Sequence, residues 1–224
     1  MQEAIDGFLI MPGWAQAALA FFVFTFVVMI VGPKVSQRRA RQHFAALAEK
    51  RHARIEPGHD VFMASFSVEQ AGRSFTVQRE LRSSARGGRI RGPQGHLIVI
   101  KTPLNNSRWE MHGVDIAQRG ALARLGGTAV RSGDAVFDQR FTVWQDGMLV
   151  REDWLDGRTR AAFTAFFDLP SVAGAGTVWV QEGRLQYIDD APGKLDDAGL
   201  TPILEQQAAL ATALEATAGG RGRG

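Results

Sequence analysis

Two aspartates four residues apart, Asp134 and Asp138, are the side chains whose type and spacing best suit chemistry. They lie in the segment Gly133-Asp-Ala-Val-Phe-Asp-Gln-Arg-Phe141. Paired carboxylates can bind a metal ion or transfer protons, and His112 is a third candidate for such a site. Aspartate at a turn, or aspartate facing Arg140, is the alternative that the pattern favours.

Histidine and cysteine usage argues against a metal centre or a nucleophilic enzyme. The chain has five histidines and no cysteine, which excludes disulfides, thiolate metal sites and cysteine nucleophiles. His52 and His59 are close in sequence, but their spacing is not that of a known metal motif. No Gly-x-Ser-x-Gly, His-Glu-x-x-His or kinase motif occurs. We therefore predict a protein that is not an enzyme, with no catalytic, cofactor-binding or metal-binding residue. The remaining histidines are His43, His96 and His112.

A basic, glycine-rich segment at residues 82–92 is the other candidate for ligand binding. It contains Arg86, Arg89 and Arg91. Phosphate cradles place backbone N–H groups at the start of a following helix, whereas here Pro93 and then a strand-like run follow. A basic loop between strands is the favoured interpretation. Contact with anionic lipid head groups or with an acidic partner is the functional alternative.

Charge is divided between the two halves of the chain. Residues 34–131 carry 18 Lys and Arg against seven Asp and Glu, whereas residues 132–217 carry six against 14. The net charge of +3 and the pI of 9.8 therefore do not describe a uniformly basic molecule. We expect no nucleic-acid partner.

An uncharged stretch near the N-terminus predicts a transmembrane helix. Trp14–Val31 has no charged residue, and at about 1.5 Å per residue it would span roughly 27 Å, close to the hydrocarbon thickness of a bilayer. A cleaved signal peptide is disfavoured because the preceding segment is acidic, and a buried core helix because no face is polar. The side chains expected to anchor the helix are Trp14, Phe21, Phe22, Phe24 and Phe26.

Basic residues after this stretch predict its orientation. Lysines and arginines follow residue 33, and none precedes the stretch, so the positive-inside rule places the N-terminus outside and the main domain in the cytoplasm of a bacterial inner membrane. Arg38, Arg39 and Arg41 are expected to contact anionic lipids of the cytoplasmic leaflet or a partner, although a purely topogenic role is the simpler interpretation. Gly32-Pro33 is expected to kink or interrupt the helix.

The predicted organisation has five parts. Residues 1–13 form a short extracytoplasmic segment, 14–32 the transmembrane helix, 33–59 a basic juxtamembrane helix and linker, 60–218 a cytoplasmic domain, and 219–224 a disordered tail. Alternating apolar residues predict hairpins at 61–81, 141–151 and 177–188 and a strand at 108–112, and a short apolar run predicts a buried strand at 96–101. Helices are predicted at 116–125, 159–167 and 198–218. The fold class is therefore α+β: a transmembrane helix followed by a mainly antiparallel β domain with two or three helices.

The distal half of the chain resembles a known type of domain. Gly133-Asp134, Phe137-Asp138 and Phe141-x-Val143, followed by the 177–188 hairpin and the C-terminal helix, make residues 130–217 similar to an uncharacterised domain of bacterial membrane proteins with one or two transmembrane helices. That resemblance implies a topology and no particular activity.

These observations lead to three hypotheses about function. The first is a non-catalytic accessory or scaffold subunit of a bacterial membrane protein complex, with other membrane protein subunits as partners. The second is a membrane-tethered sensor or module that binds a ligand or lipid through the 82–92 segment. The third is an enzyme whose site involves Asp134, Asp138 and His112.

Overall fold

The sheet is the centre of this fold. The computed structural model of the chain describes residues 12–58, 63–81, 96–105, 109, 113–119, 128–146, 154–172, 176–189 and 195–218. Nine strands are hydrogen-bonded in the order β1-β2-β3-β4-β9-β8-β5-β7-β6, and every pairing is antiparallel. The strands are β1 (Glu56–Pro57), β2 (Ala64–Gln70), β3 (Arg73–Leu81), β4 (His96–Pro103), β5 (Gly113–Gln118), β6 (Thr128–Val130), β7 (Phe141–Asp146), β8 (Thr177–Gln181) and β9 (Arg184–Asp189).

Two tight hairpins form as the sequence predicts. β2 and β3 are joined by Ala71 and Gly72, whose φ angles are 51° and 72°, and β8 and β9 by Glu182 and Gly183, with φ angles of 52° and 69°. Two central residues with positive φ match the right-handed twist of the flanking strands. The strand predicted at 96–101 is confirmed as β4. In the third predicted hairpin, β7 is present, and residues 147–151 lie outside the described residues.

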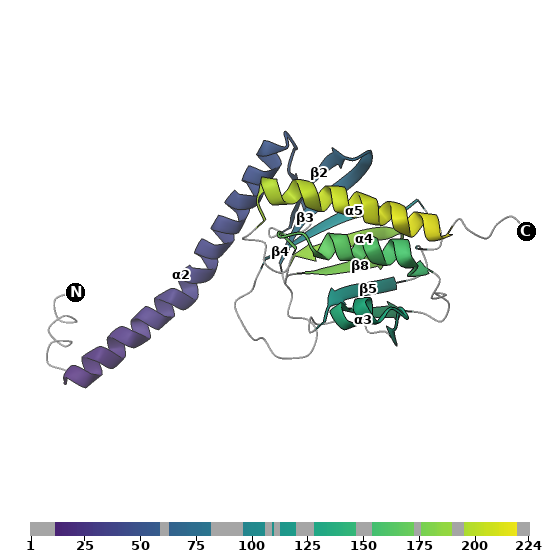
Figure 1. Cartoon of the computed structure of the whole chain (residues 1–224). Helices are drawn as coiled ribbons and strands as arrows, with labels where there is room; N and C mark the ends of the chain where they lie inside the picture. Colours follow the sequence, from purple (N-terminus) through teal and green to yellow (C-terminus); the bar gives the residue numbers. More distant parts are fainter. Residues whose placement is uncertain are drawn as a thin grey trace, which may run out of the picture.

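Two helices cover one face of the sheet and enclose the main core. α4 (Gly157–Phe167) and α5 (Asp197–Ala218) lie side by side across the strands (Figure 1). Both were predicted. Asp156 caps α4 as expected, accepting a hydrogen bond of 2.7 Å from the backbone N–H of Thr159. A short helix, α3 (Ala135–Arg140), precedes β7.

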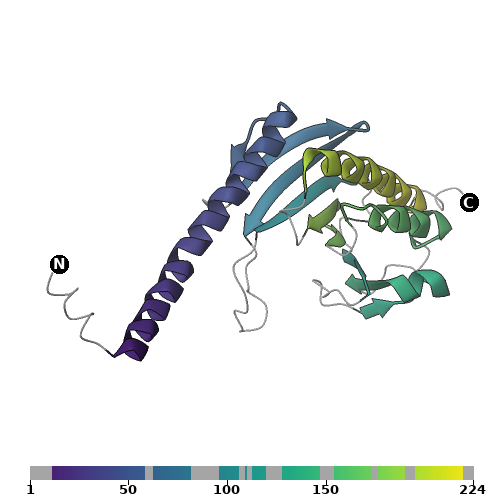
Figure 2. The same cartoon turned by 60° about the vertical axis from the view of Figure 1, so that its left-hand side comes forward.

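One long helix, α2 (Gly13–Lys50), joins this core at its C-terminal end. Phe44, Leu47 and Ala48 are buried in the main core, whereas the N-terminal half projects away from the sheet in both views (Figures 1 and 2). Gly32-Pro33 does not interrupt the helix, which continues through both residues. The predicted transmembrane and juxtamembrane helices are therefore parts of a single element.

The transmembrane part of the predicted fold class requires correction. No helix is long and apolar enough to cross a membrane among the residues that the structure describes. In α2, the uncharged stretch with described side chains covers residues 13–26, which is about 21 Å of helix against a hydrocarbon core of about 30 Å; the side chains of residues 27–34 and 36 lie outside the described ones. This finding corrects three predictions: the transmembrane span at 14–32, the inner-membrane location, and the assignment of an outside and a cytoplasmic part.

The helix predicted at 116–125 is also wrong where it can be compared. Residues 116–118 belong to strand β5, and residues 120–127 lie outside the described residues. Gly113–Ala117 are all buried, Asp115 included, so this strand has no exposed polar face that would mark its period. A short run of this kind does not distinguish a strand from a helix. Of the strand predicted at 108–112, only residue 109 is described, and it does not belong to a strand.

Candidate functional site

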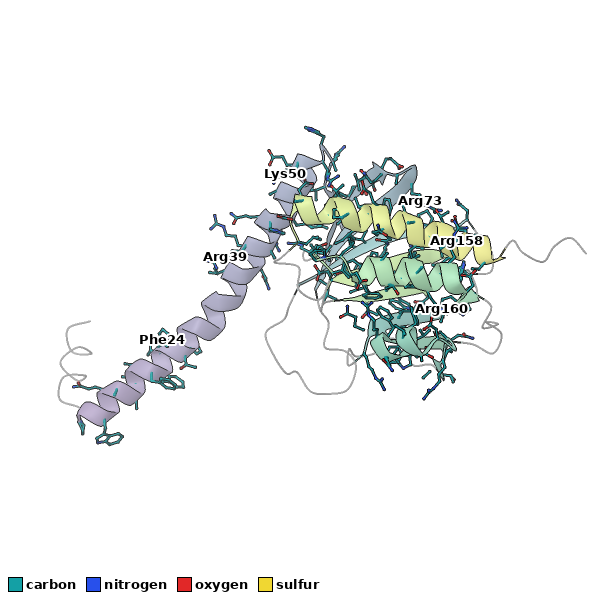
Figure 3. The ribbon with its side chains drawn as sticks, viewed as in Figure 1. Phe24, Arg39, Lys50, Arg73, Arg158 and Arg160 are labelled. Atoms are coloured by element: carbon teal, nitrogen blue, oxygen red, sulfur yellow. The ribbon has the colours of Figure 1, made fainter. Side chains whose placement is uncertain are left out.

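Large aromatic side chains are exposed along the projecting half of α2. The exposed fractions are 77% for Trp14, 72% for Phe21, 67% for Phe22, 67% for Phe24 and 53% for Phe26. Figure 3 shows Phe24 on this half, well away from the sheet. These are the five residues that the sequence singled out as a membrane anchor. We call residues 13–26 of α2 the projecting segment.

The aromatic rings of the projecting segment are distributed around the helix. At about 100° per residue, Phe22 and Phe26 point to one side and Phe21 and Phe24 to the other. The rings of Phe22 and Phe26 are stacked, with centroids 6.4 Å apart. A helix that is apolar on all sides is normally enclosed on all sides. A contact with one neighbouring surface would leave the opposite rings in water.

The arginines predicted to contact a lipid or partner lie in two places. Arg38, Arg39 and Arg41 are exposed on α2 between the projecting segment and the core, and Figure 3 shows Arg39 pointing away from the domain. Arg86, Arg89 and Arg91 lie outside the described residues. On α2, the aromatic segment is therefore followed by a short basic segment.

Side-chain contacts attach the end of α2 to the domain. The Phe44 ring packs against that of Phe66 in β2, with centroids 5.1 Å apart. Arg51, just after the helix, donates a hydrogen bond of 2.6 Å from Nε to Asp197 Oδ1 and another from Nη2 to Thr201 Oγ1, both at the start of α5. An aromatic core contact and a charged one thus hold the same end of the helix.

Arg79 in β3 is a buried cation beneath α2. It is only 4% exposed, and its guanidinium carbon lies 5.8 Å from the centroid of the Phe44 ring. Its Nε and Nη1 atoms are buried and have no hydrogen-bond partner within the described part of the chain. Burial lowers the pKa of Arg79, and the positive charge of Arg41 lowers it further.

Among the described residues, Phe44 provides a cation–π contact for Arg79. A cation–π contact contributes about 0.5–2 kcal/mol, whereas the effective penalty for burying an ion is several kcal/mol. Along the sheet, Arg79 pairs with Ile98, and Ile98 pairs with Asp189. This buried acidic residue is therefore two strands away, at a backbone separation of about 10 Å.

Asp134 and Asp138 support a helix rather than forming a carboxylate pair. Asp134 Oδ1 caps α3 by accepting hydrogen bonds of 3.0 Å from Val136 N–H and 3.2 Å from Phe137 N–H. Asp138 Oδ1 accepts hydrogen bonds of 2.9 and 2.8 Å from the backbone N–H and hydroxyl of Ser132. Both aspartates therefore have the structural roles, at a turn and at a helix cap, that the sequence favoured.

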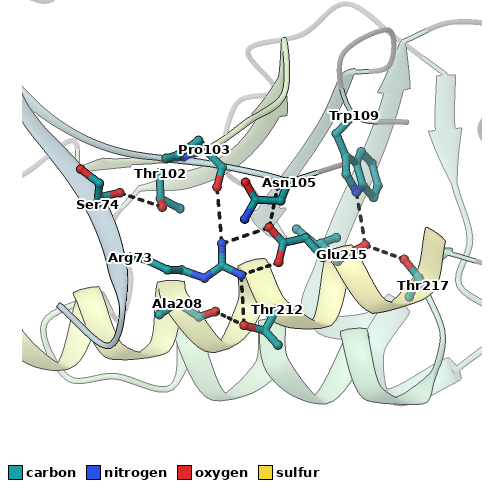
Figure 4. Close-up of polar contacts among 11 residues, drawn as sticks. Arg73, Ser74, Thr102, Pro103, Asn105, Trp109, Ala208, Thr212, Glu215 and Thr217 are labelled. Atoms are coloured by element: carbon teal, nitrogen blue, oxygen red, sulfur yellow. Dashed lines mark hydrogen bonds and ion pairs between the residues drawn. The ribbon is translucent and has the colours of Figure 1, made fainter. Parts of the chain in front are cut away.

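A charged cluster fixes the C-terminal half of α5 to the sheet (Figure 4). Arg73 in β3 forms an ion pair with Glu215 in α5 and donates a 3.4 Å hydrogen bond to the carbonyl of Pro103. The backbone N–H of Asn105 donates a 2.7 Å hydrogen bond to Glu215 Oε1. Burial alone would raise the pKa of Glu215, but the hydrogen bonds from Arg73 and Asn105 and the charge of Arg73 lower it overall.

Two of the five histidines have side chains that the structure describes. His43 and His52 lie on and just after the C-terminal part of α2, while His59, His112 and the His96 side chain lie outside the described residues. No group of three or more His, Cys, Asp or Glu in position to hold a metal ion occurs in the described ranges.

Sequence reasoning missed Arg79 as a site residue. A signal was present, since Phe75, Val77 and Arg79 alternate along β3 and the first two are core residues. Arg79 is the next residue on the same, inward-facing side of the strand, and a buried arginine without an acidic partner is uncommon. Only the packing of α2 over β2 and β3 explains why it is buried.

Comparison of the chain with protein-family models, with curated proteins and with solved structures finds no match. The resemblance of residues 130–217 to a domain of bacterial membrane proteins therefore stays a prediction.

Proposed function

We propose that this protein is a non-catalytic accessory or scaffold subunit that docks through the projecting segment of α2. The occupant that we propose for this segment is a group of apolar helices belonging to a partner protein assembly. The observation that carries the proposal is the exposure of five large aromatic side chains around a helix anchored at its other end.

The arrangement of the rings favours an enclosing partner over a simple pair of helices. A two-stranded coiled coil buries a narrow stripe along one side of each helix. In the projecting segment, Phe21 and Phe24 lie opposite Phe22 and Phe26, so a single partner helix would cover only part of the apolar surface. Several partner helices could surround the segment, with Arg38 and Arg39 contacting acidic groups at the edge of that assembly.

Site-specific photo-crosslinking in cells that express the full chain tests this proposal. A benzoylphenylalanine placed at Phe22 and, separately, at Phe24 is expected to form adducts with the same protein assembly, because the two positions face opposite sides of one enclosed helix. Val136 is the matched control, since it is apolar and 71% exposed but lies on α3; it should give no such adduct.

Several outcomes would contradict the docking proposal. Adducts only with a second copy of the chain would indicate a homo-oligomer, and adducts only with lipid would indicate a different environment for the segment. Equal labelling from Phe22, Phe24 and Val136 would indicate nonspecific contact. As a second measurement, the partner assembly should co-elute with the wild-type chain in size-exclusion chromatography and separate from a Phe21→Ser/Phe24→Ser variant.

A further inference from the structure

The projecting segment has enough exposed apolar surface for a protein interface of ordinary size. Aromatic side chains bury about 150–250 Å² each when they are fully enclosed, and the five rings of this segment are 53–77% exposed. These side chains alone therefore offer about 500–850 Å², against the roughly 800 Å² that each partner buries in a standard interface. Leu19 and Val23 are also exposed and add to this surface.

Residues 17–26 of the segment carry few groups that can form hydrogen bonds with a partner. Their side chains are those of alanine, leucine, valine, phenylalanine and one threonine, Thr25. The Thr25 hydroxyl donates a hydrogen bond of 2.7 Å to the backbone carbonyl of Phe21, one turn earlier in α2. The backbone N–H groups of this stretch lie beyond the first turn of the helix and have helical acceptors. In this described stretch, no hydrogen-bond donor is therefore left for a partner.

Trp14 differs from the other four aromatic residues because its indole carries an N–H donor. The side chain is highly exposed and lies about one turn before residues 17–26. A tryptophan that becomes buried usually has a hydrogen-bond acceptor for this group. A partner that encloses the Trp14 ring is therefore expected to offer an acceptor at this level of the helix.

We infer that the partner surrounds residues 17–26 with apolar side chains alone and provides a hydrogen-bond acceptor for Trp14 Nε1. The inference rests on the docking function proposed above and specifies the chemistry of the occupant. A polar group that is enclosed without a hydrogen-bond partner loses its contacts with water. Each donor must therefore be satisfied within the helix, as that of Thr25 is, or meet an acceptor. The acceptor opposite Trp14 would also fix the position of the segment along its axis.

Three conservative substitutions in the full chain test the two parts of this inference. The measurement is the fraction of each variant that co-elutes with the crosslinked partner assembly in size-exclusion chromatography, over a series of concentrations. Thr25→Val removes a hydroxyl that is satisfied within the helix and should leave the affinity unchanged. Phe24→Tyr adds a hydroxyl that has no acceptor in an apolar enclosure and should weaken binding about fivefold or more. Trp14→Phe keeps an aromatic ring, removes the donor and should weaken binding to a similar extent.

Controls separate binding from folding and from the mere addition of a hydroxyl. Val136→Thr adds a hydroxyl at an exposed position of α3, outside the segment, and should bind as the wild type does. The urea midpoints of all variants should equal that of the wild type, because the substituted side chains are exposed in the free chain.

Each part of the inference has its own contrary result. Unchanged affinity in Phe24→Tyr, or a loss in Thr25→Val as large as that in Trp14→Phe, overturns the apolar enclosure. Unchanged affinity in Trp14→Phe overturns the acceptor. In these cases co-elution of the wild-type chain still supports docking, whereas its failure to co-elute with any partner would overturn the docking proposal and this inference together.

Discussion

Individual charged side chains in this protein differ in how completely their charge is matched. Glu215 receives hydrogen bonds from Arg73 and from the backbone of Asn105, whereas Arg79 has a buried edge without a partner in the described part of the chain. Matched groups stabilise the fold, and unmatched groups store free energy that a ligand can release. Residues of the second kind are therefore the better candidates for function.

The Glu215 contacts predict a specific dependence of stability on pH. The pKa of Glu215 is lowered in the folded state, so its contribution is present above the unfolded value of about 4.3 and is lost as the pH falls through the lower folded value. Glu215→Gln should cost about 1–3 kcal/mol at pH 7 and less at pH 3. Urea unfolding at both pH values measures the difference.

The exposed strand residue Glu69 supplies the control for this measurement. Glu69→Gln should change the free energy of unfolding little at either pH, because surface substitutions away from special contacts have small effects. A loss in Glu215→Gln that is the same at pH 7 and pH 3 would contradict the argument from the Glu215 charge.

Elements of this fold depend to different degrees on local signals. The β2–β3 and β8–β9 hairpins and helix α4 were predicted because turn and cap residues act over two to four positions. α3 was not predicted, although its cap is the same Asp134 that suggested a carboxylate pair. The sequence offered two interpretations of that aspartate, and the backbone around Ser132 and Val136 decided between them.

The cap of α3 gives a prediction at this scale. Asp134→Ala should destabilise the protein by about 0.5–2 kcal/mol because two backbone N–H groups lose their acceptor. Asp134→Asn keeps an acceptor oxygen and should cost clearly less. Urea unfolding of both variants measures this, and a metal-dependent rise in the wild-type Tm that both variants abolish would instead support a metal-binding pair.

The two ends of the longest helix have different surroundings. One end of α2 is part of the core through Phe44, Leu47 and Ala48, and the other end carries exposed aromatics. The same residue type therefore has opposite roles on one helix: Phe44 stabilises the fold, and Phe24 is available for a contact.

This division predicts opposite effects for two equal substitutions in α2. Phe44→Ala should destabilise the domain by about 3–5 kcal/mol, because it leaves a cavity against Phe66 and Arg79. Phe24→Ala should change the free energy of unfolding by no more than about 0.5 kcal/mol. Denaturant unfolding followed by the fluorescence of the buried Trp109 and Trp154 compares them; equal losses would show that the projecting segment is part of the folded core.

The sequence alone determined the elements whose signals are local: the two hairpins, the cap of α4, the period of α5 and the apolar character of residues 14–26. The tertiary structure decided what depends on contacts between distant segments. The two predicted N-terminal helices form the single helix α2, and residues 113–118 form an interior strand of the sheet. Arg79 is buried beneath Phe44, a residue 35 positions earlier in the chain. The burial of a side chain depends on the residues that pack against it, and these are often too far away in the sequence to be recognised from a short segment.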